Sequence, residues 1–297
     1  MIVMDKVQKL LQAVLVARGA KVMRRDIAGS SMQWYELDGE PGAPPAVFVH
    51  GLGGAATNFF SVLPPLRKSF SRLYVPDLPG HGFTLLAPGE APRDTLGHFA
   101  ALNGFLDAVV REPAVLVGNS LGGALSIGIG LVRPQTLGLG LLSPAGAPLG
   151  GDDVTQLKEH FHLATRRDAV RMVGRMMHRR PPGTWLVARD LREAFDSPVV
   201  HGVVDQTSAG DSLDRERLRA LKMPVTLVWG ESDRILPRSS LDYFRDALPP
   251  GAHIEVFERC GHVPMIERPR RTVRVLARLA REAAEYRRGA VPSRRAG

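Results

Sequence analysis

A short serine motif flanked by glycines is the part of the sequence best suited to chemistry. The segment Gly118–Gly122 reads GNSLG and lies between an expected strand, Ala114–Gly118, and a helix that begins near Leu121. A serine at the tip of such a strand-to-helix turn stands clear of the sheet, which requires small neighbours on both sides. The helix N-terminus favours negative charge there, and the N–H of Leu121 faces a developing oxyanion. We therefore predict that Ser120 is a nucleophile.

A serine hydroxyl is a weak nucleophile, so this prediction requires a base and an acid that orients the base. Asp233 and His262 each follow an apolar run that reads as a strand, Val225–Trp229 and His253–Phe257. Parallel strands end at one edge of a sheet, which brings both side chains to the serine. His262 then takes the serine proton and Asp233 fixes the imidazole tautomer. Glu231 is a competing acid, although its place nearer the strand end suits a structural cap.

A second donor for the oxyanion is expected in the glycine-rich turn after the first core strand. The strand Ala46–His50 runs into the segment Gly51–Gly54, whose glycines let backbone N–H groups approach a substrate closely. Leu52 is the expected donor beside Leu121, and Gly53 is the near competitor.

Short apolar runs alternate with longer helical stretches along the chain. This pattern is typical of an α/β fold with a mostly parallel twisted sheet covered by helices on both faces. Two early runs, Lys21–Asp26 and Met32–Leu37, alternate in polarity and predict an antiparallel hairpin at the sheet edge. The other expected strands are Ala46–His50, Arg72–Pro76, Ala114–Gly118, Gly138–Leu142, Val225–Trp229 and His253–Phe257.

The strand pattern stops between residues 145 and 222, where helical segments predict a cap inserted between two sheet strands. Met172 and Met176 in this region are candidates for a substrate pocket, although methionines at helical spacing more often pack in a core. The expected cap helices are Val154–Ala164, Asp168–His178, Trp185–Phe195 and Leu213–Leu221, with Pro181, Pro182, Gly183 and Pro198 as breaks. The expected organisation is an N-terminal amphipathic helix (1–20), a core (21–144 and 223–288), the cap (145–222) and a loose basic tail (289–297).

Composition excludes several classes of protein. Of 297 residues, 44% are apolar and 23% charged, which is typical of a globular protein rather than a disordered or polytopic membrane protein. Ten Arg and three Glu from residue 267 onward carry +7 of the formal +9 charge, so we expect no nucleic-acid partner. A single cysteine, Cys260, cannot form an internal disulfide, which favours a reducing, cytoplasmic compartment.

The first 17 residues carry apolar side chains at helical spacing and predict an amphipathic helix. We expect this helix to dock on the protein body. A helix that lies on a membrane surface is the alternative, which leaves a peripheral membrane contact open.

The chain resembles the α/β-hydrolases in its core segments. The resemblance rests on HGLGG at 50–54, DLPGHG at 77–82, GNSLGG at 118–123, Asp233 and the pair Gly261-His262. The turn Ser143–Gly146 and the stretch Gly261–Pro269 are similar to monoacylglycerol lipases and to carboxylesterases with an N-terminal hydrophobic helix. Two departures from the family pattern are Phe83-Thr84 after the glycine turn and Asn119, which stands where many members have His.

The resemblance implies a serine hydrolase that cleaves carboxylic esters through an acyl-enzyme. Ser120 is then the nucleophile, Asp233 the acid and His262 the base, with Leu52 and Leu121 as oxyanion donors. The implied substrate is a small acyl ester or a lipid. A serine at this position argues against epoxide hydrolases and dehalogenases, where an aspartate stands instead.

We expect neither an organic cofactor nor a metal. The cap histidines His160, His162, His178 and His201 lack a metal-site spacing such as HExxH. A carbon–carbon hydrolase of ring-cleavage products, an acyltransferase or an amidase could use the same triad. An alternative of another class is a non-catalytic protein that binds lipid or associates with a membrane.

Overall fold

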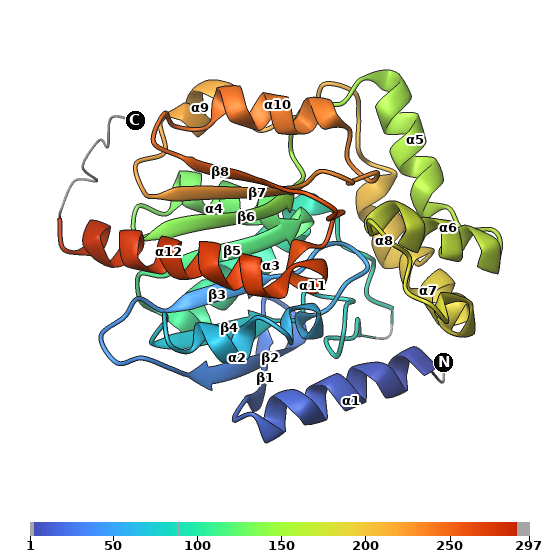
Figure 1. Ribbon diagram of the computed structural model, residues 1–297. Coiled ribbons are helices and arrows are strands. Elements are labelled where there is room, and N and C mark those ends of the chain that lie inside the picture. Colours follow the sequence, from blue (N-terminus) through green and yellow to red (C-terminus); the bar gives the residue numbers. More distant parts are fainter. Residues whose placement is uncertain (1–2, 88, 290–297) are drawn as a thin grey trace.

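An eight-stranded sheet forms the centre of the molecule, with the strand order β1-β2-β4-β3-β5-β6-β7-β8 (Figure 1). The computed structural model describes residues 3–87 and 89–289. The β1–β2 and β2–β4 pairs are antiparallel and the others parallel, which confirms the edge hairpin and the α/β fold. The strands are β1 Lys21–Ile27, β2 Ser30–Asp38, β3 Ala46–Val49, β4 Arg72–Pro76, β5 Val115–Ser120, β6 Gly138–Pro144, β7 Val225–Gly230 and β8 His253–Phe257.

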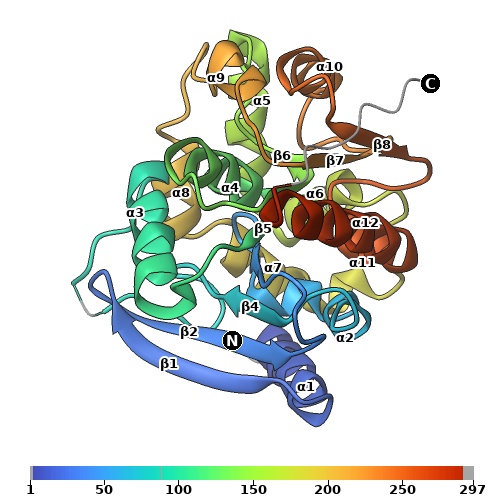
Figure 2. The same cartoon turned by 90° about the vertical axis from the view of Figure 1, so that its left-hand side faces the viewer.

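Helices bury both faces of the sheet, which explains why the central strands read as unbroken apolar runs. In β5, Val115 and Val117 join the hydrophobic core on one face, and Leu116 joins the core on the other. Figure 2 shows the two helical layers from the end of the sheet. One layer contains α3 Thr95–Phe105, α4 Leu121–Val132 and α10 Arg238–Ala247, and the other contains α2 Leu63–Leu66, α11 Pro264–Glu267 and α12 Pro269–Arg287.

The N-terminal helix α1 (Val3–Ala17) lies along the outside of the core, on the layer of α2 and α12. Leu15 is fully buried, and the Gln12 side chain donates a hydrogen bond of 3.0 Å to the Tyr35 hydroxyl. The expected helix thus docks on the body through one face. Met1 and Ile2, which the sequence placed in this helix, lie outside the described residues.

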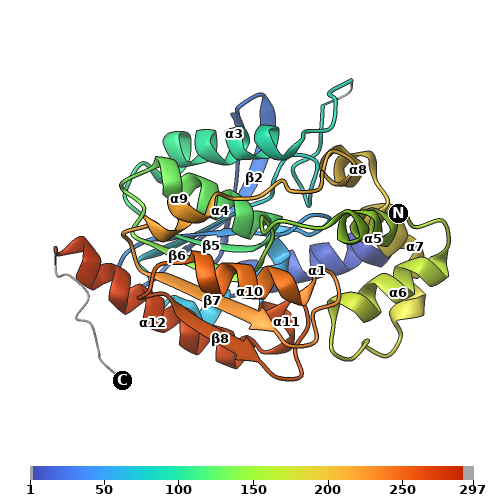
Figure 3. The same cartoon turned by 90° about the horizontal axis from the view of Figure 1, so that it is seen from above.

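A helical insertion between β6 and β7 covers the carboxyl ends of the parallel strands (Figures 1 and 3). Its helices α5 to α8 lie together beyond that edge, whereas α9 packs beside α10. The insertion contains α5 Gly151–Phe161, α6 Arg166–Met176, the 3-10 helix η3 Thr184–Val187, α7 Ala188–Phe195, α8 Pro198–Val204 and α9 Arg215–Arg219.

The insertion differs from the expected helices in three places, and one of them is the expected helix Trp185–Phe195, which divides into the 3-10 helix η3 and α7. Pro198 does not interrupt the chain but occupies the first turn of α8, where its missing N–H costs nothing. Ser197 caps this helix, since its hydroxyl accepts a hydrogen bond from the N–H of Val200. The expected helix Leu213–Leu221 shortens to α9. Residues 290–297 of the expected basic tail lie outside the described part of the chain.

Among the described residues, no helix combines the length and the apolar character needed to cross a bilayer.

Candidate active site

Ser120 occupies a strained turn between β5 and α4. Its backbone has φ 54° and ψ −119°, in a left-handed region that side chains rarely adopt. Gly118 and Gly122 make the turn possible, because a Cβ on Gly118 would lie 2.1 Å from the Gly122 carbonyl oxygen. A Cβ on Gly122 would lie 2.1 Å from the carbonyl oxygen of Val49 in β3. The two glycines thus let strand, helix and neighbouring strand approach closely enough to present the serine.

His262 and Asp233 form a buried hydrogen-bonded pair at the same sheet edge. Nδ1 of His262 lies 2.7 Å from Oδ2 of Asp233, and the side chains are 5% and 1% exposed. The other oxygen, Oδ1, accepts hydrogen bonds from the N–H groups of Ile235 (2.9 Å) and Leu236 (3.2 Å). With Nδ1–H donating to the Asp233 carboxylate, Nε2 of His262 is left as an acceptor. The Glu231 side chain, the competing acid of the sequence analysis, is exposed.

Asn119 links the serine turn to the histidine loop. Its Nδ2 donates hydrogen bonds to the carbonyl oxygens of Leu142 (2.9 Å) and His262 (3.0 Å). One side chain therefore fixes the end of β6 and the backbone of the candidate base relative to the residue beside Ser120. From the sequence alone, Asn119 is only a departure from the family pattern, because its contacts join loops far apart along the chain.

The glycine-rich turn after β3 lies directly against the serine. A Cβ on Gly51 would lie 3.0 Å from the Cβ of Ser120. His50 holds this turn, because its Nε2 accepts the N–H of Leu78 (3.0 Å) and its Nδ1 then donates to the Gly51 carbonyl (2.8 Å). Burial lowers the pKa of His50 well below its ordinary value, which keeps the ring neutral in this role. The turn thus places Leu52, one predicted donor, beside the nucleophile.

Two further features are consistent with an oxyanion site. Leu121 is the first residue of α4, so its N–H has no carbonyl partner within the helix. Gly53, the competing donor, has φ 68°, and a Cβ there would lie 2.5 Å from the Phe195 ring of α7. The competing position is thus covered by the cap.

Asp77 braces the neighbouring turn of the core. Its buried carboxylate accepts the N–H groups of Ala56 (2.7 Å) and Phe83 (3.0 Å). Burial raises the pKa of Asp77 to about 6, and these two hydrogen bonds oppose the shift. A Cβ on Gly82 would lie 2.2 Å from Oδ1, so the glycine in the DLPGHG segment makes room for the carboxylate.

A cavity of about 390 Å³ opens beside Ser120 and His262. Both methionines proposed from the sequence, Met172 and Met176, line it from α6. Most of its wall is apolar, and none of the described residues in the wall is Lys or Arg. Cap side chains in the wall include Phe161, Met172, Val173, Met176, Met177, Val187, Leu191 and Phe195.

The end of α6 is attached directly to the loops that carry the acid and the base. The N–H of His262 donates to the Met176 carbonyl (2.7 Å), and the N–H of Arg234 donates to the Arg175 carbonyl (3.2 Å). Glu267 adds a brace that the sequence did not indicate, since its carboxylate accepts the N–H groups of Gly261 (2.5 Å) and His178 (2.9 Å). The cap therefore contacts the core at the loop after β8 that carries the candidate base.

A family model confirms what the fold indicates. Residues 46–275 match the model of the alpha/beta hydrolase family. The chain belongs to this family. The match begins at β3 and ends in α12, so it covers the serine turn, the insertion and the loops of Asp233 and His262.

Curated relatives carry different activities in their names. The chain is 31% identical over 261 residues to the dihydrolipoyllysine-residue acetyltransferase component of the acetoin cleaving system of Pseudomonas putida. That match covers 84% of this chain and 67% of the relative, so the chain spans about two thirds of that protein. This chain is also 24% identical to the mouse (Mus musculus) monoacylglycerol lipase ABHD6, and that match covers 82% of this chain and 77% of the lipase.

Solved structures share the fold at lower identity. A putative lipase from Acinetobacter baumannii superposes with a TM-score of 0.81 at 20% identity and covers 94% of this chain and 97% of its own. A meta-cleavage product hydrolase from Pseudomonas fluorescens superposes with a TM-score of 0.74 at 22% identity. This match covers 88% of this chain and 98% of the hydrolase. The family and its hydrolase fold are thus established for this chain.

Proposed function

We propose that the protein is a serine hydrolase of carboxylic esters with an apolar acyl chain. The proposal rests above all on His262, which is hydrogen-bonded to Asp233 and lines one apolar cavity together with Ser120. The lipase named among the relatives agrees with this chemistry.

In the proposed reaction, the Ser120 oxygen attacks the ester carbonyl while Nε2 of His262 takes the hydroxyl proton. The tetrahedral oxyanion accepts hydrogen bonds from the N–H groups of Leu52 and Leu121. Collapse of this intermediate breaks the ester bond, and His262 returns the proton to the leaving alcohol. A water molecule then attacks the acyl-enzyme with His262 again as base, which releases the carboxylic acid and restores Ser120. Asp233 fixes the ring and stabilises the imidazolium in both steps.

The cavity wall favours an ester over a ring-cleavage product. Ring-cleavage products carry a carboxylate, and a buried anion requires a cationic or hydrogen-bonding partner. The described wall contains no Lys or Arg, and its few hydrogen-bonding side chains, such as Asn58 and Thr184, leave it mostly apolar. A neutral ester therefore fits this wall better than an anionic dienoate.

A substrate panel tests the proposed activity. Purified protein is assayed with p-nitrophenyl esters of short to long chain, with an anionic ring-fission diketone, and with an ester plus an added thiol or amine acceptor. We expect hydrolysis of the esters and little turnover of the diketone. Cleavage of the diketone alone, or acyl transfer that outruns hydrolysis, would replace the esterase assignment with one of the other two activities.

We also propose that the protein meets lipid surfaces beside this cavity. In α1, Leu10 is 63% exposed, and Gln8 lines the cavity. In η3, Trp185 is 71% exposed, next to Thr184 in the cavity wall. α1 also contacts α7, which directly follows η3, so the elements that carry these exposed apolar side chains lie close together (Figure 3).

Liposome flotation tests the membrane contact. The double variant Leu10→Ser with Trp185→Ser is expected to float severalfold less than the unchanged protein. Val132→Ser is the control, because Val132 is an exposed apolar residue at the end of α4 remote from the serine turn. Equal flotation of all three proteins would remove the membrane contact and leave the esterase proposal standing.

A further inference from the structure

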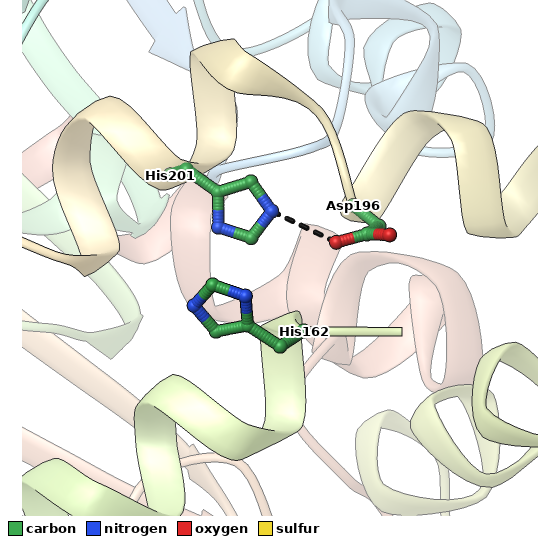
Figure 4. Close-up of side chains that lie close together, drawn as sticks. All are labelled: His162, Asp196 and His201. Atoms are coloured by element: carbon green, nitrogen blue, oxygen red, sulfur yellow. Dashed lines mark hydrogen bonds and ion pairs between the residues drawn. The ribbon is translucent and has the colours of Figure 1, made fainter. Parts of the chain in front are cut away.

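Four side chains from separate parts of the cap meet outside the catalytic cavity. His162 directly follows α5, Asp196 directly follows α7, and His201 lies within α8 (Figure 4). Asp205 directly follows α8. None of the four belongs to the described wall of the cavity, so their arrangement is not explained by the proposed hydrolysis.

Asp205 is bonded to His162 and lies near His201. Its Oδ1 lies 3.0 Å from Nε2 of His162, and its Oδ2 lies 3.7 Å from Nδ1 of His201. The opposite nitrogen of His201, Nε2, lies 2.8 Å from Oδ1 of Asp196. Figure 4 shows a ring nitrogen of His162 turned toward the side where His201 and Asp196 meet. One carboxylate thus holds the His162 ring and lies near His201, and a second carboxylate holds the opposite nitrogen of His201.

Three of these side chains bring their ligand atoms close to the spacing of a metal site. Ligand atoms of His162, Asp196 and His201 lie within 4.8 Å of one another. Donors that share one zinc ion lie roughly 3–4 Å apart, because each lies about 2 Å from the ion. The two rings are stacked with centroids 4.1 Å apart and must tilt open to point at one ion. His162 is 51% exposed, so its ring has room for this rotation.

The carboxylate of Asp205, next to the second nitrogen of each ring, also suits a metal site. Histidine ligands commonly give their second nitrogen to a carboxylate, which fixes the ring and raises its basicity as a ligand. Asp205 is placed for this task. Nδ1 of His201 is buried and lacks a hydrogen bond, since Asp205 remains 3.7 Å away. A rotation that brings His201 onto an ion would let this nitrogen close the gap to Asp205.

We propose that His162, Asp196 and His201 bind one divalent transition-metal ion, with Asp205 as the carboxylate behind both imidazoles. Two nitrogens and one carboxylate oxygen form a ligand set that suits Zn²⁺, and a water molecule completes a tetrahedron. The proposal departs from the expectation that the protein binds no metal. That expectation considered only spacing along the chain, whereas these ligands meet through three separate helices.

The ion would fasten the cap rather than take part in hydrolysis. It joins the ends of α5 and α7 to α8, and Asp196 directly follows Phe195. Phe195 lies on Gly53 and lines the cavity. Metal binding is therefore expected to stabilise the folded cap above the serine turn, an effect that is measured without any substrate.

Zinc titration of the full chain tests the site. Protein without a histidine tag is treated with a chelator, dialysed, and titrated with zinc chloride in a calorimeter. We expect one ion per chain and a rise in melting temperature on zinc addition. Cobalt chloride should give visible absorption bands of a tetrahedral site. Absence of one-to-one binding would overturn the proposal.

Matched histidine variants locate the ion. His201 and His253 are both 22% exposed, and each is bonded to a carboxylate, at 2.8 Å and 2.9 Å. His201→Ala should lose most zinc affinity and the melting shift, whereas His253→Ala should keep both. Asp205→Asn should lower zinc affinity about 10–100-fold.

Two results would contradict this location. They are an unchanged zinc affinity in His201→Ala and an equal loss in His253→Ala, which would indicate adventitious binding to surface histidines. If His201→Ala does not fold, His162→Gln replaces it, because His162 lies at a helix end with half of its side chain exposed. Unchanged zinc affinity in folded His162→Gln also overturns the proposal.

Discussion

At the scale of single residues, the turn at Ser120 has a strained backbone that raises the free energy of the folded state. The left-handed backbone conformation is retained only because Gly118 and Gly122 allow β5, α4 and β3 to pack closely around it. Under the proposed function, this strained turn presents the hydroxyl of Ser120 for reaction. The proposed chemistry therefore predicts separate effects on activity and on stability.

Replacing the nucleophile should remove activity and leave the fold intact. For Ser120→Ala we expect kcat for a p-nitrophenyl ester to fall by ~10³-fold or more, because the acyl-enzyme cannot form. The melting temperature should change little, since the hydroxyl is lost from a cavity wall. Adding His262→Ala should lower kcat hardly further, because the two residues act as one unit. Additive losses in the double variant would contradict the shared role.

Asn119 offers a test of positioning. Asn119→Ala removes both hydrogen bonds from Nδ2 and leaves the carbonyl groups of Leu142 and His262 without this donor. We expect a loss of stability of about 1–3 kcal/mol, and a fall in kcat of up to ~10²-fold with KM nearly unchanged. Urea denaturation and ester kinetics measure the two effects. A purely structural Asn119 would lower stability while kcat of the folded protein stayed the same.

The sequence places the candidate triad at one sheet edge but does not indicate the residues that support it. Ser120, Asp233 and His262 each follow a recognisable strand, and parallel strands must end at one edge. Glu267 and Asn119 act through backbone groups of other loops, and no spacing along the chain reports such contacts. The cluster of His162 and His201 is hidden for the same reason, because it forms only when separate cap helices pack together.

At the scale of elements, α6 determines how much room the cavity has. Met172 is almost fully buried, whereas Met176 at the end of the helix lines the cavity and accepts the N–H of His262 at its backbone carbonyl. A change in the Met176 side chain should therefore alter the cavity more than the candidate triad.

Filling the cavity from α6 should shorten the acyl chain that the protein accepts. For Met176→Trp we expect kcat/KM to fall ~10-fold or more for a long-chain ester, because a larger ring occupies apolar volume that the chain would fill. The acetate ester should be hydrolysed nearly as before, which serves as the internal control. An equal loss for both esters would place Met176 outside the acyl pocket.

The sheet strands were easier to predict from the sequence than the helices of the insertion. Apolar runs predicted the buried strands well, since both faces of the sheet are covered. The sequence did not predict α8, because Pro198 reads as a helix break. Proline is nevertheless favoured in the first turn of a helix, which is where Pro198 lies. Ser197 before it was the available signal, as a helix cap of the expected type.

At the scale of the whole molecule, a row of buried histidines ties stability to pH. The His50 and His81 rings lie 5.1 Å apart, and those of His81 and His98 lie 5.5 Å apart. Burial lowers the pKa of His81 to about 4 and that of His98 to about 3. At His98 the charges of His81 and Arg93 add to this shift and that of Asp94 opposes it. The folded protein therefore holds these rings neutral.

The protein should lose stability as the pH falls below about 6.5. In that range the unfolded chain binds protons at His50, His81 and His98, whereas the folded chain does not until the pH approaches 4, so the free energy of unfolding decreases. Asp77 has the opposite effect between about pH 6 and pH 3.8. There the carboxyl of the folded chain binds a proton before that of the unfolded chain, so this group raises the free energy of unfolding as the pH falls. One carboxyl does not offset three imidazoles, so we expect a net loss on the order of a few kcal/mol.

Urea denaturation at about pH 7.5 and about pH 5 measures this dependence. His98→Phe should flatten it, because this substitution removes one proton site. Both ring nitrogens of His98 are buried without a hydrogen bond, so the substitution breaks none at neutral pH. An equal pH dependence in the variant would show that other groups control acid stability.

Labelling with a fluorophosphonate probe, followed by peptide mapping, tests the proposed hydrolase most directly. The probe reacts with an activated serine and reports the nucleophile and the reaction class together. We predict one label per chain on the peptide that contains Ser120, abolished in Ser120→Ala and strongly slowed in His262→Ala. Label on a different serine, or ester turnover by a chain whose Ser120 stays unlabelled, would contradict the proposal.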